Sequence, residues 1–211
     1  MATRHLSTHP AEHGNRERYL EAALAVLLDR GVAGLTVRGV AEAAGASTIS
    51  VYARFGGRTG LLDALYERTF DSLREMLESL PEPGADGVAD LMSLALEYRR
   101  FARESPARYG LMFERPVPDF DPDPSLRSAM LRTTFSLFIA RVQRVCPAET
   151  DARTAAYQLW AAMHGLVSTE LTIGSRNPLT GWFISPTEQA GEDIYRQGVR
   201  AMIDGLGLGN I

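Results

Sequence analysis

The sequence contains no lysine and only one cysteine. All 22 of its basic residues are arginine, so any contact with a phosphate group must come from arginine, a hydroxyl, a tyrosine or a backbone amide. The single Cys146 excludes an internal disulfide and a cysteine-based zinc site. A lone cysteine is typical of a protein from a reducing compartment.

Long apolar runs are also missing. No stretch approaches the roughly 18–20 apolar residues of a membrane span, and residues 1–14 lack the apolar run of a signal peptide. We therefore expect a cytoplasmic protein without membrane contact, whose residues 1–14 form a disordered tail. No strand-like alternation of polar and apolar residues persists, which argues against a sheet.

Catalytic motifs are absent as well. The sequence shows no phosphate-binding glycine loop, no nucleophile elbow and no pair of histidines at metal-ligand spacing. The acids Glu114, Asp119, Asp121 and Asp123 stand in or beside residues 115–124, which contain four prolines and so indicate a stiff, exposed loop rather than a metal site. We expect no enzymatic activity, no cofactor and no metal.

The charge is unevenly distributed along the chain. The formal net charge is −4, which argues against a generally basic coat for nucleic acid. Residues 1–66 nevertheless carry 7 arginines against 6 acids, whereas residues 67–211 carry 15 arginines against 20 acids. This asymmetry fits a small phosphate-contacting surface attached to a larger acidic body.

Helical periodicity is the dominant pattern, and it predicts an all-α fold of about nine helices. The expected helices cover residues 15–30, 37–44, 48–55, 58–80, 85–104, 106–113, 125–145, 150–174 and 186–206. The first has an apolar stripe of Tyr19, Leu20, Ala23, Leu24, Leu27 and Leu28. The seventh is expected to bury Leu131, Thr134, Phe135, Phe138, Ile139 and Val142. The pattern predicts a three-helix head over residues 15–57 and a helical bundle over residues 58–211.

Residues 35–65 have the features of a helix-turn-helix. Gly45 suits the tight turn between two short helices, and the small Ala41, Ala44 and Ala46 let these helices approach closely. Thr36 and Ser47 are placed to cap the two helices. The inner face is expected to consist of Val37, Val40, Val51 and Phe55. The outward face of the second helix, which could enter a major groove, consists of Thr48, Ile49, Ser50, Ala53 and Arg54.

This segment resembles the TetR family of bacterial repressors over roughly residues 15–66. The family pattern is matched by Leu35-Thr36-Val37-Arg38, Val40-Ala41, Ala44-Gly45-Ala46-Ser47, Val51-Tyr52-Ala53-Arg54-Phe55, and Arg58 with Leu61-Leu62. Three positions depart from it: Ala46 replaces the usual valine, Ile49 stands where glycine or proline is frequent, and Arg58 replaces lysine. Arg58 still supplies a cation, and Ile49 could contact a thymine methyl group.

The resemblance implies a role for each exposed residue of the motif. Thr36, Tyr52 and Arg58 would contact backbone phosphates. The side chains that would face base edges are Arg38, Thr48, Ile49, Ser50 and Arg54, with Ser47 at the same surface. It also implies a homodimer that binds a palindromic double-stranded operator and is released by a small-molecule effector.

The body carries a second resemblance, to a family subgroup with a Trp–x–x–x–His–Gly signature, at Trp160, His164 and Gly165, with residues 109–113 upstream. Trp160 and His164 share one helix face, and Gly165 would let another helix approach closely. A pocket for an apolar or amphipathic ligand could be lined by Tyr98, Phe101, Met112, Phe113, Met130, Phe135, Phe138, Trp160 and His164. Each of these could instead be plain core, and repression or activation stays open.

Two other classes of function compete with a regulator. An enzyme lacks support from any motif. A helical protein-interaction module would account for the bundle but not for the placement of Arg38, Tyr52 and Arg58. The sequence therefore favours a ligand-responsive transcriptional repressor of the TetR type.

Overall fold

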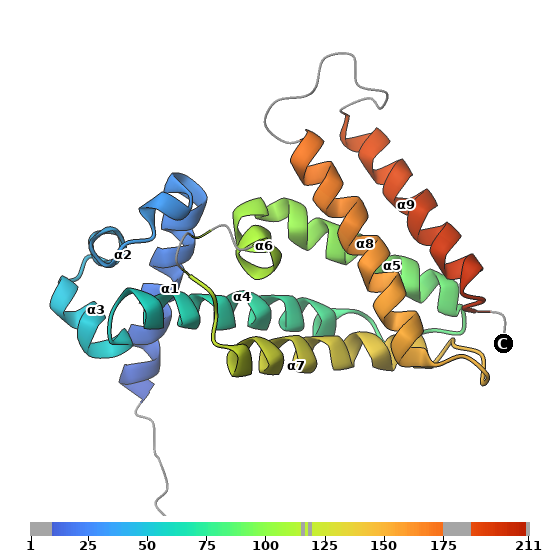
Figure 1. The fold of residues 1–211 in the computed structure, drawn as a ribbon, viewed down its shortest axis with the longest axis horizontal. Helices are drawn as coiled ribbons and strands as arrows, with labels where there is room; N and C mark the ends of the chain where they lie inside the picture. Colours follow the sequence, from blue (N-terminus) through green and yellow to red (C-terminus); the bar gives the residue numbers. More distant parts are fainter. Residues whose placement is uncertain (1–9, 115–116, 118–119, 175–186, 210–211) are drawn as a thin grey trace, which may run out of the picture. The chain divides into compact units, whose positions relative to one another are not determined.

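The structure is a computed structural model that describes residues 10–114, 117, 120–174 and 187–209, with side chains from Arg16 onward. In this part of the chain all regular elements are helical, which confirms the all-α prediction (Figure 1). The α-helices are α1 (Pro10–Arg30), α2 (Val37–Ala43), α3 (Thr48–Phe55), α4 (Arg58–Ser79), α5 (Gly87–Glu104), α6 (Pro106–Phe113), α7 (Pro124–Gln143), α8 (Ala152–Gly174) and α9 (Glu188–Gly205). A 3₁₀ turn, η1, covers Val32–Gly34.

The helix ends follow the local chemistry of the sequence. Helix α1 starts at Pro10, five residues before the expected Asn15, and proline is favoured at a first helical position because its missing N–H is not needed there. Helix α5 begins after Asp86, whose carboxylate accepts a hydrogen bond from the Ala89 backbone N–H at 2.9 Å. Residues 1–9 of the expected tail lie outside the described residues.

The chain divides into two compact units. The first contains residues 1–71 and 107–128, and the second contains residues 72–106 and 129–211. In the first unit, α1 and the middle of α4 are joined by ion pairs between Arg16 and Glu67 at 3.1 Å and between Arg68 and Glu17 at 2.7 Å. These exposed or half-exposed pairs orient the two helices and add little stability.

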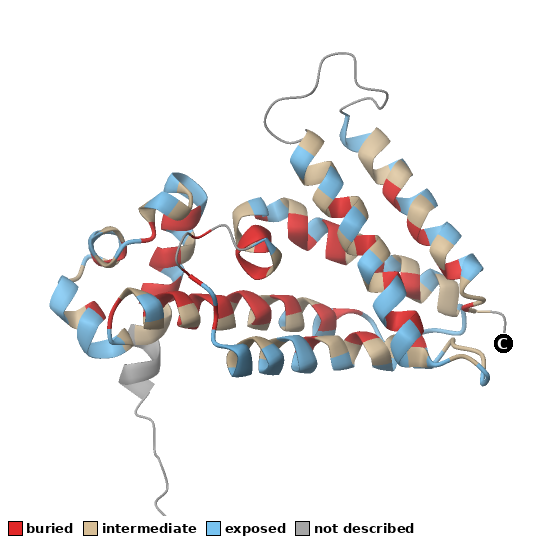
Figure 2. Cartoon of the chain, in the orientation of Figure 1, coloured by how far each residue is buried: buried red, intermediate tan, exposed pale blue. Residues whose placement is uncertain are grey.

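The core of the first unit lies where α1, α2, α3 and α4 meet. Leu20, Leu27, Val51, Leu61 and Leu65 are each at most 1% exposed (Figure 2). Burial of such side chains is the main stabilising contribution, about 1.5–3 kcal/mol each relative to exposure. Helix α6 adds aromatic rings to this unit, since Phe113 contacts Phe70 and Tyr109 with ring centroids 5.9 and 4.9 Å apart.

The second unit packs α5, α8 and α9 together. Its apolar contacts include Leu94, Leu159, Met163 and Val199, none of which is exposed to solvent. Tyr195 of α9 is also buried, and its hydroxyl donates to the Ala95 carbonyl at 2.9 Å.

Several details differ from the predicted helical stripes. Leu28 is 56% exposed and Leu131 is 38% exposed, so neither belongs to the core that the periodicity assigned to it. The stripe is wider than the surface that a neighbouring element covers, and its edge stays in water. The loop before α7 was expected to be exposed, but Val117 and Phe120 are buried, because removing apolar side chains from water is favourable.

Candidate nucleic-acid interface

Helices α2 and α3 are each capped at the N-terminus by a hydroxyl side chain. The Thr36 hydroxyl accepts a hydrogen bond from the Gly39 N–H at 2.9 Å, and the Ser47 hydroxyl accepts one from the Ser50 N–H at 3.3 Å. Both predicted caps are therefore confirmed. Gly45 makes the turn with φ of 60°, a left-handed conformation that favours glycine.

The inner face of the motif is buried as the sequence predicts, although not uniformly. Val40 and Val51 are fully buried, whereas Val37 and Phe55 are half-buried. Phe55 packs edge-to-face on Tyr19 of α1 at 5.9 Å, which ties the end of α3 to the first helix.

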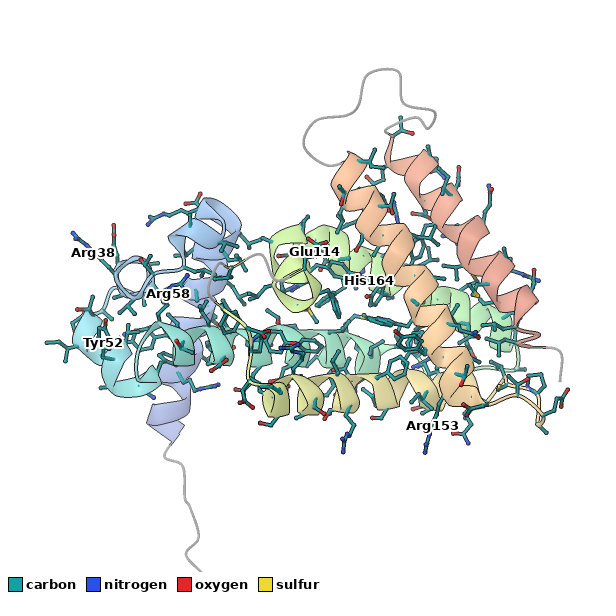
Figure 3. All side chains as sticks on the ribbon, viewed as in Figure 1. Arg38, Tyr52, Arg58, Glu114, Arg153 and His164 are labelled. Carbon is teal, nitrogen blue, oxygen red and sulfur yellow. The ribbon has the colours of Figure 1, made fainter. Side chains whose placement is uncertain are left out.

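The opposite face of α3 is open to solvent. Ile49 is 78% exposed and Tyr52 is 57% exposed, and Arg38, Thr48 and Arg54 are exposed beside them. Figure 3 shows Arg38 and Tyr52 projecting outward from the head. No carboxylate pairs with Arg38 among the described residues, so its guanidinium group is free to bind an external acceptor.

Hydroxyl groups at the start of α3 are partly engaged within the helix. Ser50 donates its hydroxyl to the Ser47 carbonyl at 2.7 Å, and the two serine hydroxyl oxygens lie 3.1 Å apart. Ser50 therefore has acceptor capacity left for an external donor, such as an exocyclic amine on a base edge.

Arg58 has a structural contact that the sequence did not reveal. Its Nε donates to the Leu35 carbonyl at 3.1 Å, and the side chain is half-buried. This bond links the first residue of α4 to the segment that precedes α2. The terminal nitrogens of the guanidinium group can still donate to a phosphate. A contact between residues 23 positions apart has no local signal in the sequence.

The residues proposed to line a pocket in the body are only partly brought together. In the second unit, the Trp160 ring stacks on His164 at 5.4 Å and meets Phe135 at 6.1 Å. The Trp160 Nε1 donates to the Tyr98 hydroxyl at 3.2 Å. Phe138 stacks on Phe135 at 5.9 Å. These five residues are called the aromatic cluster.

The other four predicted pocket residues lie on three different helices. Phe101 is buried on α5 and Met130 is half-buried on α7, while Met112 and Phe113 belong to the first unit. Sequence reasoning missed Tyr157, which is 59% exposed and meets Phe135 at 6.3 Å. Its position one turn before Trp160 is the signal that could have identified it.

Gly165 does not have the role expected of it within this chain. The residue is exposed, and a Cβ atom added there would have no neighbour within 4 Å. The close approach of two helices occurs instead at Gly198 of α9, where an added Cβ would lie 2.8 Å from Leu166 of α8.

No group of three histidine, cysteine or carboxylate side chains gathers as metal ligands in the described ranges. Two acids of the proline-rich loop have internal partners. Asp121 pairs with Arg127, and Asp123 accepts hydrogen bonds from the Ser125 hydroxyl and backbone N–H, which lower the pKa of Asp123. Among the described helices, none is long and apolar enough to cross a membrane.

Comparison with known families matches both parts of the chain. Residues 20–65 match "Bacterial regulatory proteins, tetR family", and residues 91–181 match "Tetracyclin repressor-like, C-terminal domain". Together the two matches cover more than half of the sequence, and the first contains the whole helix-turn-helix. The chain belongs to the TetR family.

Individual TetR-family relatives agree with this assignment. An uncharacterised HTH-type transcriptional regulator of Mycobacterium tuberculosis, Rv0681, is 29% identical over 160 residues, which are 75% of this chain and 71% of that protein. The fatty acid degradation regulator FadR from Bacillus halodurans superposes with a TM-score of 0.70 at 13% identity, covering 96% of this chain and 99% of that one. SmeT, the repressor of the Stenotrophomonas maltophilia multidrug efflux pump SmeDEF, superposes with a TM-score of 0.61 at 18% identity, covering 90% of this chain and 89% of that one.

These two structural likenesses show the fold alone. The family consists of transcriptional regulators that bind DNA through the helix-turn-helix. This TetR-family chain is therefore a helix-turn-helix transcriptional regulator and not an enzyme.

Proposed function

We propose that the chain is a ligand-responsive repressor that binds a palindromic operator as a homodimer in the cytoplasm. The observation that carries this proposal is the open face of α3, where Ile49 and Tyr52 are more than half exposed on a helix whose other face is buried. A short helix of this kind fits a major groove about 12 Å wide. Two heads are needed because paired half-sites repeat about one helical turn apart.

Within this proposal, Arg38, Thr48, Ile49 and Ser50 face base edges. Thr36, Tyr52 and Arg58 contact backbone phosphates, and Ser47 and Arg54 belong to the same surface. Arg38 is an exposed guanidinium without a protein partner among the described residues, so it is the best placed to read a guanine bidentately.

Replacing Tyr52 with phenylalanine is expected to weaken operator binding about tenfold, the effect of losing one hydrogen bond to a charged group. The loss should be equal for every operator sequence, because a phosphate contact carries no sequence information. Titration of labelled duplexes by fluorescence anisotropy measures it. Tyr157→Phe, which removes the other strongly exposed tyrosine hydroxyl, is the matched control and should leave the affinity unchanged. Equal affinities for Tyr52→Phe and the control would show that the Tyr52 hydroxyl makes no contact with a phosphate.

The proposed effector is a small apolar or amphipathic molecule that binds at the aromatic cluster of the second unit, with Phe101 and Met130 as further candidate contacts. The aromatic rings of the cluster offer apolar contact to such a molecule, and the His164 imidazole adds one polar, titratable group. Helix α4 connects the effector to DNA binding in this proposal, because Arg58 at its start is bonded to the Leu35 carbonyl. A shift of α4 would then change the spacing of the two heads.

Ligand action can be tested with Trp160 as the reporter. The chain has two tryptophans, so Trp182→Phe leaves Trp160 as the only one. A panel of medium-chain fatty acids and planar aromatic cations is titrated while the Trp160 emission and the operator affinity are recorded. We expect any compound that shifts the emission to weaken operator binding, and linkage requires operator DNA to weaken binding of that compound by the same factor. Compounds that shift the emission with equal affinity for free and operator-bound protein would contradict the proposal.

A further inference from the structure

A groove runs beside the recognition helix α3, on the side where α1 lies. It has a volume of about 610 Å³. Its seven lining residues are Arg18, Tyr19, Ala46, Ser47, Ser50, Ala53 and Arg54. None of them is acidic. The side chains of Ala46 and Ala53 are small and leave space between Arg18 and Arg54.

Arg18 is held beside α3 by a series of ring contacts. Its guanidinium carbon lies 5.5 Å from the centroid of the Tyr19 ring, a cation–π arrangement. The Tyr19 ring in turn packs on Phe55, the last residue of α3, at 5.9 Å. Arg18 is exposed and Tyr19 is buried. The position of this cation is therefore coupled to the position of the recognition helix.

When α3 is bound in the major groove of DNA, the width of the helix decides which part of the DNA meets the protein groove beside it. An α-helix with its side chains is about 10–12 Å across, and the major groove is about 12 Å wide. The helix thus fills the groove, and a sugar–phosphate backbone runs along each of its sides. In the proposed complex one of these backbones meets Thr36, Tyr52 and Arg58, none of which lines the groove between α3 and α1. On the other side the backbone meets the groove between α3 and α1.

We infer that Arg18 and Arg54 hold an operator backbone phosphate between them, with the hydroxyls of Ser47 and Ser50 beside it. This inference rests on the proposed operator binding and deepens it in two ways. It adds Arg18, which lies outside the helix-turn-helix motif. It also assigns Arg54 to the backbone, although the sequence placed Arg54 at a base edge. The recognition helix is then clamped on both of its sides.

The test uses the full-length protein, a duplex selected by it from a random-sequence pool, and all single-base-pair variants of that duplex. Dissociation constants are measured against salt concentration for the unaltered chain, Arg18→Gln and Arg54→Gln. The matched control is Arg30→Gln, an exposed arginine at the other end of the same helix. Circular dichroism verifies that each variant is folded.

Each of the two groove variants is expected to reduce the slope of log K against log salt by about 1, the change for one lost phosphate contact. The loss of affinity should be the same factor for every base-pair variant. Arg30→Gln should match the unaltered chain, and Arg18→Lys, which keeps the charge, should restore the slope. A neutral methylphosphonate placed at the clamped phosphate should weaken the unaltered chain but cause no further loss in the double variant Arg18→Gln, Arg54→Gln.

Two results would overturn the inference. One is an Arg18→Gln variant whose slope equals that of Arg30→Gln. The other is an Arg54→Gln variant that relaxes the preference at a single base pair, because this would return Arg54 to base reading. Failure of the unaltered chain to select any duplex would instead overturn the proposed operator binding, and with it the basis of the clamp.

Discussion

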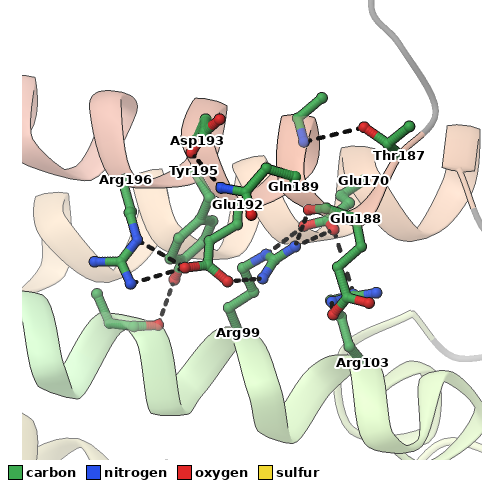
Figure 4. A network of polar contacts seen from close by, with 12 residues as sticks. Arg99, Arg103, Glu170, Thr187, Glu188, Gln189, Glu192, Asp193, Tyr195 and Arg196 are labelled. Atoms are coloured by element: carbon green, nitrogen blue, oxygen red, sulfur yellow. Dashed lines mark hydrogen bonds and ion pairs between the residues drawn. The ribbon is translucent and has the colours of Figure 1, made fainter.

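Replacing Glu170 with alanine is expected to lower the free energy of unfolding by about 3 kcal/mol. Its partner Arg99 is only 4% exposed, and two hydrogen bonds of 2.8 and 2.7 Å join the guanidinium group to the Glu170 carboxylate (Figure 4). Burial opposes the charge of Arg99, yet the hydrogen bonds and charge of Glu170 outweigh it and the pKa of Arg99 is raised. Without Glu170, the Arg99 cation keeps one directly paired carboxylate among the described residues, that of Glu192 at 3.3 Å.

This loss is large because the network joins three helices of the second unit. Arg99 lies on α5, Glu170 on α8 and Glu192 on α9. The exposed neighbour Arg100, which pairs with Glu97 and Glu104 on its own helix, provides the control. Arg100→Ala should cost at most about 1 kcal/mol. Urea unfolding at one fixed protein concentration measures both variants, since stability and dimerisation are linked. Equal losses would contradict the account of Arg99 as a buried, paired charge.

Replacing Gly60 with alanine is expected to weaken operator binding at least 100-fold. A Cβ atom there would lie 2.0 Å from the Phe55 carbonyl oxygen, which is backbone and cannot rotate away. Phe55 ends α3, and Gly60 is in the first turn of α4. The two helices must therefore move apart. This moves the exposed face of α3 away from Arg58, whose Nε is bonded to the Leu35 carbonyl. Overpacking of this kind also destabilises the fold by about 1–3 kcal/mol.

The neighbouring Thr59→Ala is the control for this substitution, because Thr59 is exposed and lies in the same helical turn. It should leave operator affinity within a factor of two, roughly 0.4 kcal/mol. Operator affinity and thermal unfolding are measured for both variants. A Gly60→Ala protein that binds as tightly as Thr59→Ala would show that the junction between α3 and α4 has no part in positioning the DNA-binding face.

Local patterns allowed most of the helices and the motif to be predicted. Apolar spacing located the helices, and the hydroxyls of Thr36 and Ser47 marked the starts of α2 and α3 because a cap involves residues only three positions apart. What could not be predicted depends on residues far apart in the sequence. Arg99 and Glu170 are 71 positions apart, and neither periodicity nor composition indicates which acid will meet a given arginine.

The same limit applies to the candidate interface. Motif spacing pointed to the exposed face of α3 but gave no sign of Arg18, because its place beside α3 depends on how Tyr19 meets Phe55. Aromatic residues at helical spacing likewise do not reveal which of them meet, and the contact of Phe135 on α7 with Trp160 on α8 is an example.

The most direct test of operator binding by a dimer is selection of duplexes from a random-sequence pool by the purified protein, followed by a footprint on the enriched sequence. An operator-binding dimer should select a palindromic site with two protected half-sites whose centres are about 10–10.5 base pairs apart, or a multiple of that spacing. Affinity for this site should fall steeply with salt. Recovery of no enriched sequence, or of a site without two-fold symmetry, would contradict an operator-binding dimer.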